Sequence, residues 1–211
     1  MKQEKQDKKE LIFDALEELM VTVPYAEISV EAIAKKAGIG KGSIYYYFKS
    51  KDEILYEVIE RSYRRITRDY FETIRNLPEM SAIEKIKRLF ISTVKKEFSK
   101  TERNMLTELH ILDDRDIHYK MKTIAIQEIS PILTELLKEG VAEGSIRTQT
   151  PRESAEIIVA VMTLFLDETI FTDSPESVLN KLKILSNVLE TCLCTEKGSF
   201  DFLFEPRTFS E

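Results

Sequence analysis

The chain has 211 residues, of which 43% are hydrophobic and 32% are charged, a balance typical of a globular protein with its own core. Lysine and arginine number 31 against 37 aspartate and glutamate, so the formal charge is −6 and a uniformly basic nucleic-acid coat is excluded. Two cysteines and two histidines exclude a disulfide framework and argue against a zinc site, so we expect no metal and no cofactor.

Apolar residues recur at i, i+3, i+4 and i+7 along nearly the whole chain, which predicts an all-α fold. The first helix ends before Pro24, the second spans 29–38 and a short third spans 40–48. A fourth helix spans 50–77 and a fifth 81–100, and each opens with a Ser-x-x-Glu capping box.

The second half of the chain shows softer helix signals. We expect helices over 104–112, 116–139, 151–171 and 173–196, with a bend at the proline of the second and helix-ending glycines directly after it. The tail that starts at Gly198 is rich in phenylalanine. Two interpretations of this tail stay open, a packed extension over a hydrophobic groove or a disordered segment.

The N-terminal segment does not resemble a targeting sequence. Asp14, Glu17 and Glu18 interrupt its apolar residues, whereas a signal peptide needs an uninterrupted apolar region. No uncharged apolar run in the sequence approaches the length of a membrane span. We therefore expect a soluble, cytoplasmic protein without a membrane partner.

One segment, 28–51, carries specific chemistry. Two short helices joined by Ala37-Gly38-Ile39-Gly40 match a helix-turn-helix, in which a small residue sits where the helices cross and a glycine permits the sharp turn. Between Lys35 and Lys51 the sequence has five lysines and no acid. On a chain of charge −6 this is a local positive island, which favours DNA phosphates.

Three consecutive tyrosines lie in the predicted second helix of this motif. Tyrosine hydroxyls donate to phosphate oxygens, and the rings pack on sugars or thymine methyl groups. The alternative is that Tyr45 and Tyr47 form a wall of the small core. For Gly42 the two interpretations are a close approach of the backbone to a DNA groove and simple tolerance of a turn.

With these residues identified, the segment from Leu11 to about Ile59 resembles the DNA-binding region of the TetR family of bacterial transcriptional regulators. The matching residues are Ser29-Val30-x-x-Ile33-Ala34-x-x-Ala37-Gly38-Ile39, then Lys41-Gly42-Ser43-Ile44-Tyr45-x-Tyr47-Phe48, and then Lys49-Ser50-Lys51-Asp52-Glu53-Ile54-Leu55. The rest of the chain resembles the family in being a helical ligand-binding and dimerisation domain.

The resemblance implies a DNA-contact role for eight residues. Lys41, Gly42 and Ser43 would face base edges in the major groove, with Tyr46 beside them. Phosphates would be held by Tyr45, Tyr47, Lys51 and Ser29. Two positions depart from the family pattern and put the sequence preference in doubt: Gly40 stands where Ser or Thr often caps the recognition helix, and Tyr47 stands where His is frequent.

We therefore predict two domains, a helix-turn-helix domain over 1–49 and an effector-binding and dimerisation domain over 50–211, linked by the helix that starts at Ser50. Because a single helix-turn-helix makes few base contacts, it needs a dimer and a two-half-site, palindromic operator. The last two helices are apolar around much of their circumference, which makes them the candidate dimer interface; the alternative is an ordinary core. The interface candidates are Ile158, Val161, Leu182, Leu185 and Leu189.

The middle helices are candidates for a small-molecule site, since bulky apolar side chains with sparse polar groups are typical of such sites. The competing interpretation of each residue is plain core. The candidates are Tyr63, Phe90, Phe98, His110, Tyr119, Met162 and Phe165.

Catalytic motifs are missing from the sequence, which has no Gly-rich phosphate loop, GxSxG, HExxH or CxxC, so we expect no catalytic residues and no enzyme. The predicted function is a homodimeric repressor that binds double-stranded operator DNA and is released by a small, largely apolar effector. Two alternatives stay open: an activator with the same fold, and a helical small-molecule-binding or interaction protein with weak DNA binding.

Overall fold

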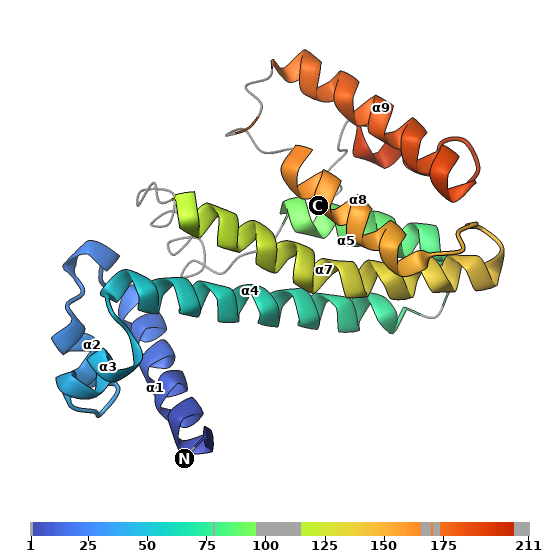
Figure 1. Cartoon of the computed structure of the whole chain (residues 1–211). Coiled ribbons are helices and arrows are strands. Elements are labelled where there is room, and N and C mark those ends of the chain that lie inside the picture. Colours follow the sequence, from blue (N-terminus) through green and yellow to red (C-terminus); the bar gives the residue numbers. More distant parts are fainter. Residues whose placement is uncertain (1, 78, 96–114, 166–169, 171–173, 205–211) are drawn as a thin grey trace. The chain divides into compact units, whose positions relative to one another are not determined.

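The computed structural model describes residues 2–77, 79–95, 115–165, 170 and 174–204, and within these ranges the chain forms helices and no strand. The all-helical class predicted from the sequence is confirmed, and the helix expected over 104–112 lies outside the described residues. In chain order the elements are α1 (Lys2–Met20), η1 (Tyr25–Glu27), α2 (Val30–Lys36), α3 (Lys41–Tyr47), α4 (Lys51–Arg75), α5 (Ala82–Lys95), α7 (Arg115–Glu143), α8 (Pro151–Phe165), α9 (Pro175–Leu193) and η2 (Asp201–Leu203) (Figure 1).

The chain divides into two compact units. The N-terminal unit comprises 1–66 and 97–121, and the C-terminal unit comprises 67–96 and 122–211. The N-terminal unit extends beyond the predicted 1–49 domain because Ile54, Leu55 and Val58 at the start of α4 are fully buried in its core. Helix α4 therefore begins in one unit and ends in the other.

The core of the N-terminal unit is built from the inward faces of α1, α2, α3 and the first turns of α4 (Figure 1). Ala34 is buried where α2 packs next to α3, and Gly38 has a φ of 68°, the left-handed conformation that suits glycine. The amide of Ile39 donates to the carbonyl of Ala34 (3.0 Å), which closes the turn. The predicted helix-turn-helix thus has the expected small crossing residue and turn glycine.

Of the two predicted capping boxes, the one at Ser81 forms in full and the one at Ser50 forms in part. The Ser50 hydroxyl accepts from the Glu53 amide (3.1 Å), while the Glu53 carboxylate accepts from the amide of Lys49, one residue earlier than a standard box. At the start of α5 the box is reciprocal: the Glu84 amide donates to the Ser81 hydroxyl (3.3 Å), and the Ser81 amide donates to the Glu84 carboxylate (3.2 Å). Each box therefore satisfies amides that the helix itself leaves unpaired.

Arg61 fastens α4 to α1. Its guanidinium lies 2.7 Å from Glu10, 2.8 Å from Asp14 and 3.0 Å from Glu17, and it stacks 5.2 Å from the centre of the Phe13 ring. Burial tends to lower the pKa of Arg61, but the carboxylates outweigh that effect and raise it, so the guanidinium stays charged. These contacts hold α1 against α4 within the N-terminal unit.

The C-terminal unit has a separate core, built from α5, α7, α8, α9 and the end of α4. Helix α7 continues through Gly140 to Glu143, beyond the predicted end at residue 139, and Pro131 lies within it. Gly140 does not end the helix as predicted. A Cβ on this glycine would lie 2.5 Å from Cδ1 of the buried Ile146, so the glycine allows Ile146 to approach the helix closely.

The phenylalanine-rich tail is a packed extension through Phe204. Phe200 is buried, and the Phe202 ring stacks on the Phe90 ring with centroids 6.4 Å apart. The Glu190 carboxylate stabilises the turn that precedes Phe200. It accepts hydrogen bonds from the amides of Gly198 (2.7 Å) and Phe200 (3.3 Å). Of the two interpretations of the tail, the packed extension therefore holds for residues 198–204. Residues 205–211 lie outside the described residues.

None of the helices in the described part of the chain combines the length and apolar character that crossing a bilayer requires. Among the described residues there is also no group of three or more His, Cys, Asp or Glu side chains placed to hold a metal ion.

Candidate nucleic-acid interface

Helix α3 has one buried face and one exposed face. Ile44 is fully buried and anchors the helix on the core of the N-terminal unit, and Phe48 at its C-terminal end is buried as well. The exposed face presents Tyr45, which is 53% exposed, and Tyr46, which is 66% exposed. Large aromatic side chains this open to water are typical of a binding surface.

The three tyrosines do not share one environment. Tyr47 is half-buried against the core, and its ring meets the Tyr46 ring edge-on, with centroids 5.0 Å apart and planes at 88°. Of the two alternatives weighed for these residues, a partial wall of the core fits Tyr47, whereas exposure fits Tyr45. The Tyr46–Tyr47 contact also limits how the exposed Tyr46 ring can turn.

Lys41, the first residue of α3, forms an ion pair with Glu31 in the first turn of α2. The hydrogen bond from the Lys41 ammonium lowers the pKa of Glu31, and the same bond raises the pKa of Lys41. The ammonium also lies 5.9 Å from the centre of the Tyr45 ring. A carboxylate therefore sits beside the lysine that was predicted to face base edges.

The helix starts at this surface differ in their caps. Ser29 caps α2, and its hydroxyl oxygen accepts from the amide of Ala32 (3.1 Å). Gly40 stands at the cap of α3 with no side chain to accept a hydrogen bond, as its sequence position implied. Gly42 is the second residue of α3. A Cβ added to it would meet no described atom within 4 Å.

Lys51 makes contacts within the protein that the sequence did not predict. Its ammonium donates to the carbonyls of Tyr25 (2.8 Å) and Ile28 (2.9 Å) and lies 4.0 Å from the centre of the Tyr25 ring. The Tyr25 hydroxyl in turn donates to the Asp52 carboxylate (2.6 Å). An ammonium has three N–H donors, so one remains for the phosphate contact that the resemblance implies.

Glu31, Tyr25 and Asp52 are absent from the predicted set of site residues. Each acts through a partner ten or more positions away along the chain, and helical periodicity carries no signal over that separation. Glu31 in particular reads in the sequence as an ordinary acid in the first turn of a helix.

The predicted effector residues fall into different parts of the structure. Phe90 is buried in the core of the C-terminal unit, and Met162 and Phe165 pack against that core. Tyr63 and Tyr119 belong to the N-terminal unit. Tyr63 is half-buried, and its burial raises its pKa to about 12. Tyr119 is 73% exposed. Phe98 and His110 lie outside the described residues.

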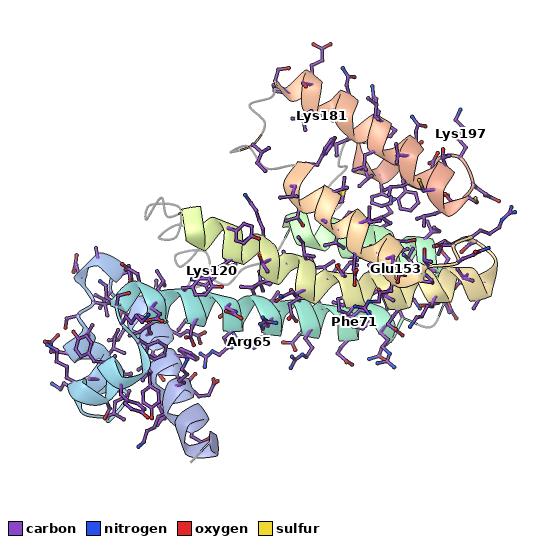
Figure 2. All side chains as sticks on the ribbon, viewed as in Figure 1. Arg65, Phe71, Lys120, Glu153, Lys181 and Lys197 are labelled. Carbon is purple, nitrogen blue, oxygen red and sulfur yellow. The ribbon has the colours of Figure 1, made fainter. Side chains whose placement is uncertain are left out.

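Each unit also contains a lysine whose ammonium group lies over an aromatic ring. The Lys120 ammonium lies 4.9 Å from the centre of the Tyr56 ring in the N-terminal unit, and the Lys181 ammonium lies 5.4 Å from that of Phe165 in the C-terminal unit. Lys120 on α7 and Lys181 on α9 are labelled in Figure 2. Phe165 is thus partly covered by α9.

Three of the residues predicted for the dimer interface are buried within the single chain. Ile158, Leu185 and Leu189 are buried in the unit's own core, so they have almost no surface left to lose to a partner. Leu182 is half-buried. Five of the apolar side chains that remain exposed on these two helices make up what we call the apolar stripe: Ile157, Val161 and Leu164 on α8, and Ile184 and Val188 on α9.

Comparison with known proteins places these features in a family. Residues 12–58 match the model of bacterial regulatory proteins of the tetR family, and 98–188 match a tetracyclin repressor-like C-terminal domain. The chain is 30% identical over 187 residues to the fatty acid metabolism regulator protein of Bacillus subtilis, covering 85% of this chain and 90% of that protein.

Solved structures show the same fold. RolR in complex with resorcinol aligns with a TM-score of 0.57 at 14% identity, over 98% of this chain and 97% of that one. SmeT, the repressor of the Stenotrophomonas maltophilia multidrug efflux pump SmeDEF, aligns with a TM-score of 0.52 at 18% identity, over 96% of each chain. The helix-turn-helix, the helical C-terminal unit and the Bacillus relative agree: the chain is a transcriptional regulator, not an enzyme, and belongs to the TetR family.

Proposed function

We propose that this regulator is a homodimeric repressor that leaves its operator when a small, largely apolar effector binds. The observation that carries the DNA-binding part is the two-sided construction of α3, with Ile44 fully buried and Tyr45 and Tyr46 more than half exposed. A helix anchored in this way can enter the major groove without giving up its own packing. Acting on chromosomal DNA, such a regulator works in the cytoplasm.

The DNA contacts divide into two kinds. Lys41, Gly42 and Ser43 at the start of α3 read base edges, with Tyr46 beside them, because a lysine donates to guanine O6 and N7 and a glycine lets the backbone come close. Phosphate contacts, which fix the register but carry no base information, come from Ser29, Tyr45, Tyr47 and the remaining donor of Lys51.

Dimerisation is proposed through the apolar stripe. Two copies would bring α8 and α9 together as a four-helix bundle and hold two α3 helices for two half-sites of a palindromic operator. Val161 belongs to both the predicted interface and the stripe, and the other stripe residues take the place of those found buried.

The proposed effector is a molecule with a long apolar portion. Phe90, Met162 and Phe165 supply apolar and polarisable surface in the C-terminal unit, and the Bacillus relative is named as a regulator of fatty acid metabolism. Fatty acids are therefore the first class to test. A coupling of about 1–3 kcal/mol between the effector and DNA sites would give a useful response.

The test starts from a selection of duplexes by the purified protein. We expect a palindrome whose half-sites are about 34 Å apart or a multiple of that, and fatty acids of graded chain length should lower the affinity for it. Tyr46→Ala should weaken operator binding, whereas Val21→Ala, a change at a side chain 55% exposed in the same unit, should not. Failure to enrich any common sequence would contradict the proposal.

A further inference from the structure

The Lys41–Glu31 ion pair joins the two helices of the helix-turn-helix at the end where the reading helix begins. Lys41 is the first residue of α3, and Glu31 is the second residue of α2, two positions after the Ser29 cap. Both side chains are open to solvent, with exposed fractions of 47% and 60%. Gly40 supplies no side chain to hold the start of α3, so this pair is a side-chain link at a point that lacks a cap.

We propose that Glu31 is a positioning and specificity-determining residue: its carboxylate directs the Lys41 ammonium and cancels the attraction of that ammonium for phosphate, so that Lys41 contributes to operator binding but little to binding of other DNA. The inference rests on the DNA-binding part of the proposed function. It adds an acidic residue to a surface for which basic and hydroxyl side chains are the expected contacts.

The charge argument concerns non-operator DNA. Each lysine that neutralises a phosphate releases a counterion, which is the main source of sequence-independent affinity. A carboxylate bonded to the same lysine stays at the surface and repels the phosphate, so the pair together contributes almost no net charge. The regulator therefore binds the large excess of non-operator sites with lower affinity than it would if Lys41 were unpaired.

The geometry argument concerns the operator. A lysine is a compact charge on a flexible stem, and ordering that stem costs side-chain entropy. Glu31 on one side and the Tyr45 ring, 5.9 Å from the ammonium, on the other already restrict it before DNA arrives. The ammonium has three donors, so the bond to Glu31 leaves others for guanine O6 and N7.

The chain offers a closely matched control pair. Lys36 at the end of α2 lies 2.5 Å from Glu18 of α1, with exposed fractions of 47% and 62%, nearly the same as those of Lys41 and Glu31. Glu18→Gln and Glu31→Gln remove the same charge from the same unit at the same exposure. Only Glu31 is bonded to a residue of the reading helix.

The experiment measures the affinity of the full-length protein for its selected operator and for a scrambled duplex of equal length, over a range of salt concentrations. For Glu31→Gln we expect scrambled-duplex affinity to rise about five- to tenfold near 0.1 M salt, with a salt slope steeper by about 0.9, as for one extra phosphate neutralised. Operator affinity should rise less, so the ratio of the two affinities falls.

Two further variants separate the roles of charge and position. Glu31→Asp keeps the charge and should restore the wild-type salt slope on scrambled DNA. The double variant Glu31→Gln, Lys41→Gln replaces a neutral pair by another neutral pair, so its salt slope on the scrambled duplex should also match wild type.

The inference is overturned if Glu31→Gln changes the salt slope and the affinity ratio no more than Glu18→Gln does. It is also overturned if the double variant keeps the steeper slope, because the gain would then not come from Lys41. A wild-type protein that does not distinguish the operator from the scrambled duplex would instead contradict the proposed function. Equal melting temperatures of Glu31→Gln and Glu18→Gln would show that a difference between their DNA affinities does not come from a loss of stability.

Discussion

The ammonium of Lys51, in the first turn of α4, donates a 2.9 Å hydrogen bond to the carbonyl of Ile28, the residue before the cap of α2. A second bond of 2.8 Å reaches the carbonyl of Tyr25, and the Tyr25 hydroxyl returns to Asp52, next to Lys51 in the chain. Three hydrogen bonds therefore join the start of α4 to residues 25–28, the segment that leads into α2.

Replacing Lys51 by Met removes both carbonyl contacts while keeping the apolar stem over the Tyr25 ring. Hydrogen bonds from a charged donor contribute about 1.5–3 kcal/mol, so we expect the N-terminal unit to lose roughly that much free energy of unfolding. The measurement is urea unfolding followed by circular dichroism.

Lys49→Met serves as the control for this change, because Lys49 is exposed and its loss should stay within about 0.5 kcal/mol. Equal unfolding midpoints for the two variants would show that the Lys51 contacts do not stabilise the unit. Operator affinity of Lys51→Met should fall further than its stability loss explains if the third donor holds a phosphate.

The sequence predicted the parts of the fold that depend on neighbouring residues. The Ser50–Glu53 and Ser81–Glu84 boxes span three positions, and the turn at Gly38 needs one residue with positive φ. Such signals are local, so they survive without knowledge of the tertiary structure. The exposure of Tyr46 agrees with the place that the family pattern implied for it, whereas the sequence left Tyr45 open between exposure and the core.

The contacts that tertiary packing creates were missed. Glu31 and Lys41 lie ten positions apart on two helices, and their meeting depends on the angle between those helices. On α8 and α9 the apolar residues cover so much of each helix that periodicity did not separate the core residue Leu189 from its exposed neighbour Val188. Only the packing of the unit shows which side faces inward.

Tyr63 should contribute to a late alkaline titration step of the regulator. Burial raises its pKa to about 12 in the folded chain, above the value of about 10 for an unfolded one. The folded state therefore holds this proton more tightly, and the contribution of Tyr63 to stability is complete below pH ~10 and is lost as the pH rises through ~12. Tyr63→Phe should make the fall in stability over that window shallower, as measured by urea unfolding at a series of pH values.

Phenolate absorbance during a titration of the folded protein gives a direct check on Tyr63. Tyr56 also has a pKa raised to about 12, mainly by burial and then by the charge of Glu60. Wild type should thus show late-titrating tyrosines, and Tyr63→Phe should remove part of that late step while leaving the contribution of Tyr56. An unchanged late step in the variant would contradict the burial assigned to Tyr63.

Val188→Lys tests the apolar stripe as the dimer interface. Val188 is 48% exposed on α9, so the lysine is accommodated in a single chain but would be buried without a partner charge in the dimer. We expect a cost of about 3 kcal/mol or more, which raises the dissociation constant of the dimer at least about 100-fold. Sedimentation at several protein concentrations measures it.

Val141→Lys provides the comparison for Val188→Lys. Val141 is 40% exposed near the end of α7, in the same unit but outside the stripe. Its replacement by lysine should therefore leave the dissociation constant of the dimer unchanged. If Val188→Lys stays dimeric while wild type is also dimeric, another surface holds the two copies. Operator affinity should fall in parallel with dimerisation, because each copy carries one α3.

Gly42 allows the effect of a substitution on folding to be separated from its effect on DNA binding. Its backbone does not have positive φ, and an added Cβ meets no described atom within 4 Å. Alanine reduces the freedom of the unfolded chain, so Gly42→Ala should stabilise the free protein by about 0.4–1 kcal/mol. Thermal unfolding of the DNA-free protein measures this gain.

The same methyl group should weaken operator binding if the backbone of α3 lies against the groove at Gly42. Overpacking a close contact costs about 1–3 kcal/mol, so we expect operator affinity to fall about tenfold or more although the protein itself is more stable. Gly40→Ser is the matched comparison: it adds a capping hydroxyl at the start of α3, should stabilise by a few tenths of a kcal/mol, and should leave operator affinity intact. A Gly42→Ala protein that binds the operator as tightly as wild type would mean that this glycine serves only the turn, and that the closest approach to DNA lies elsewhere on α3.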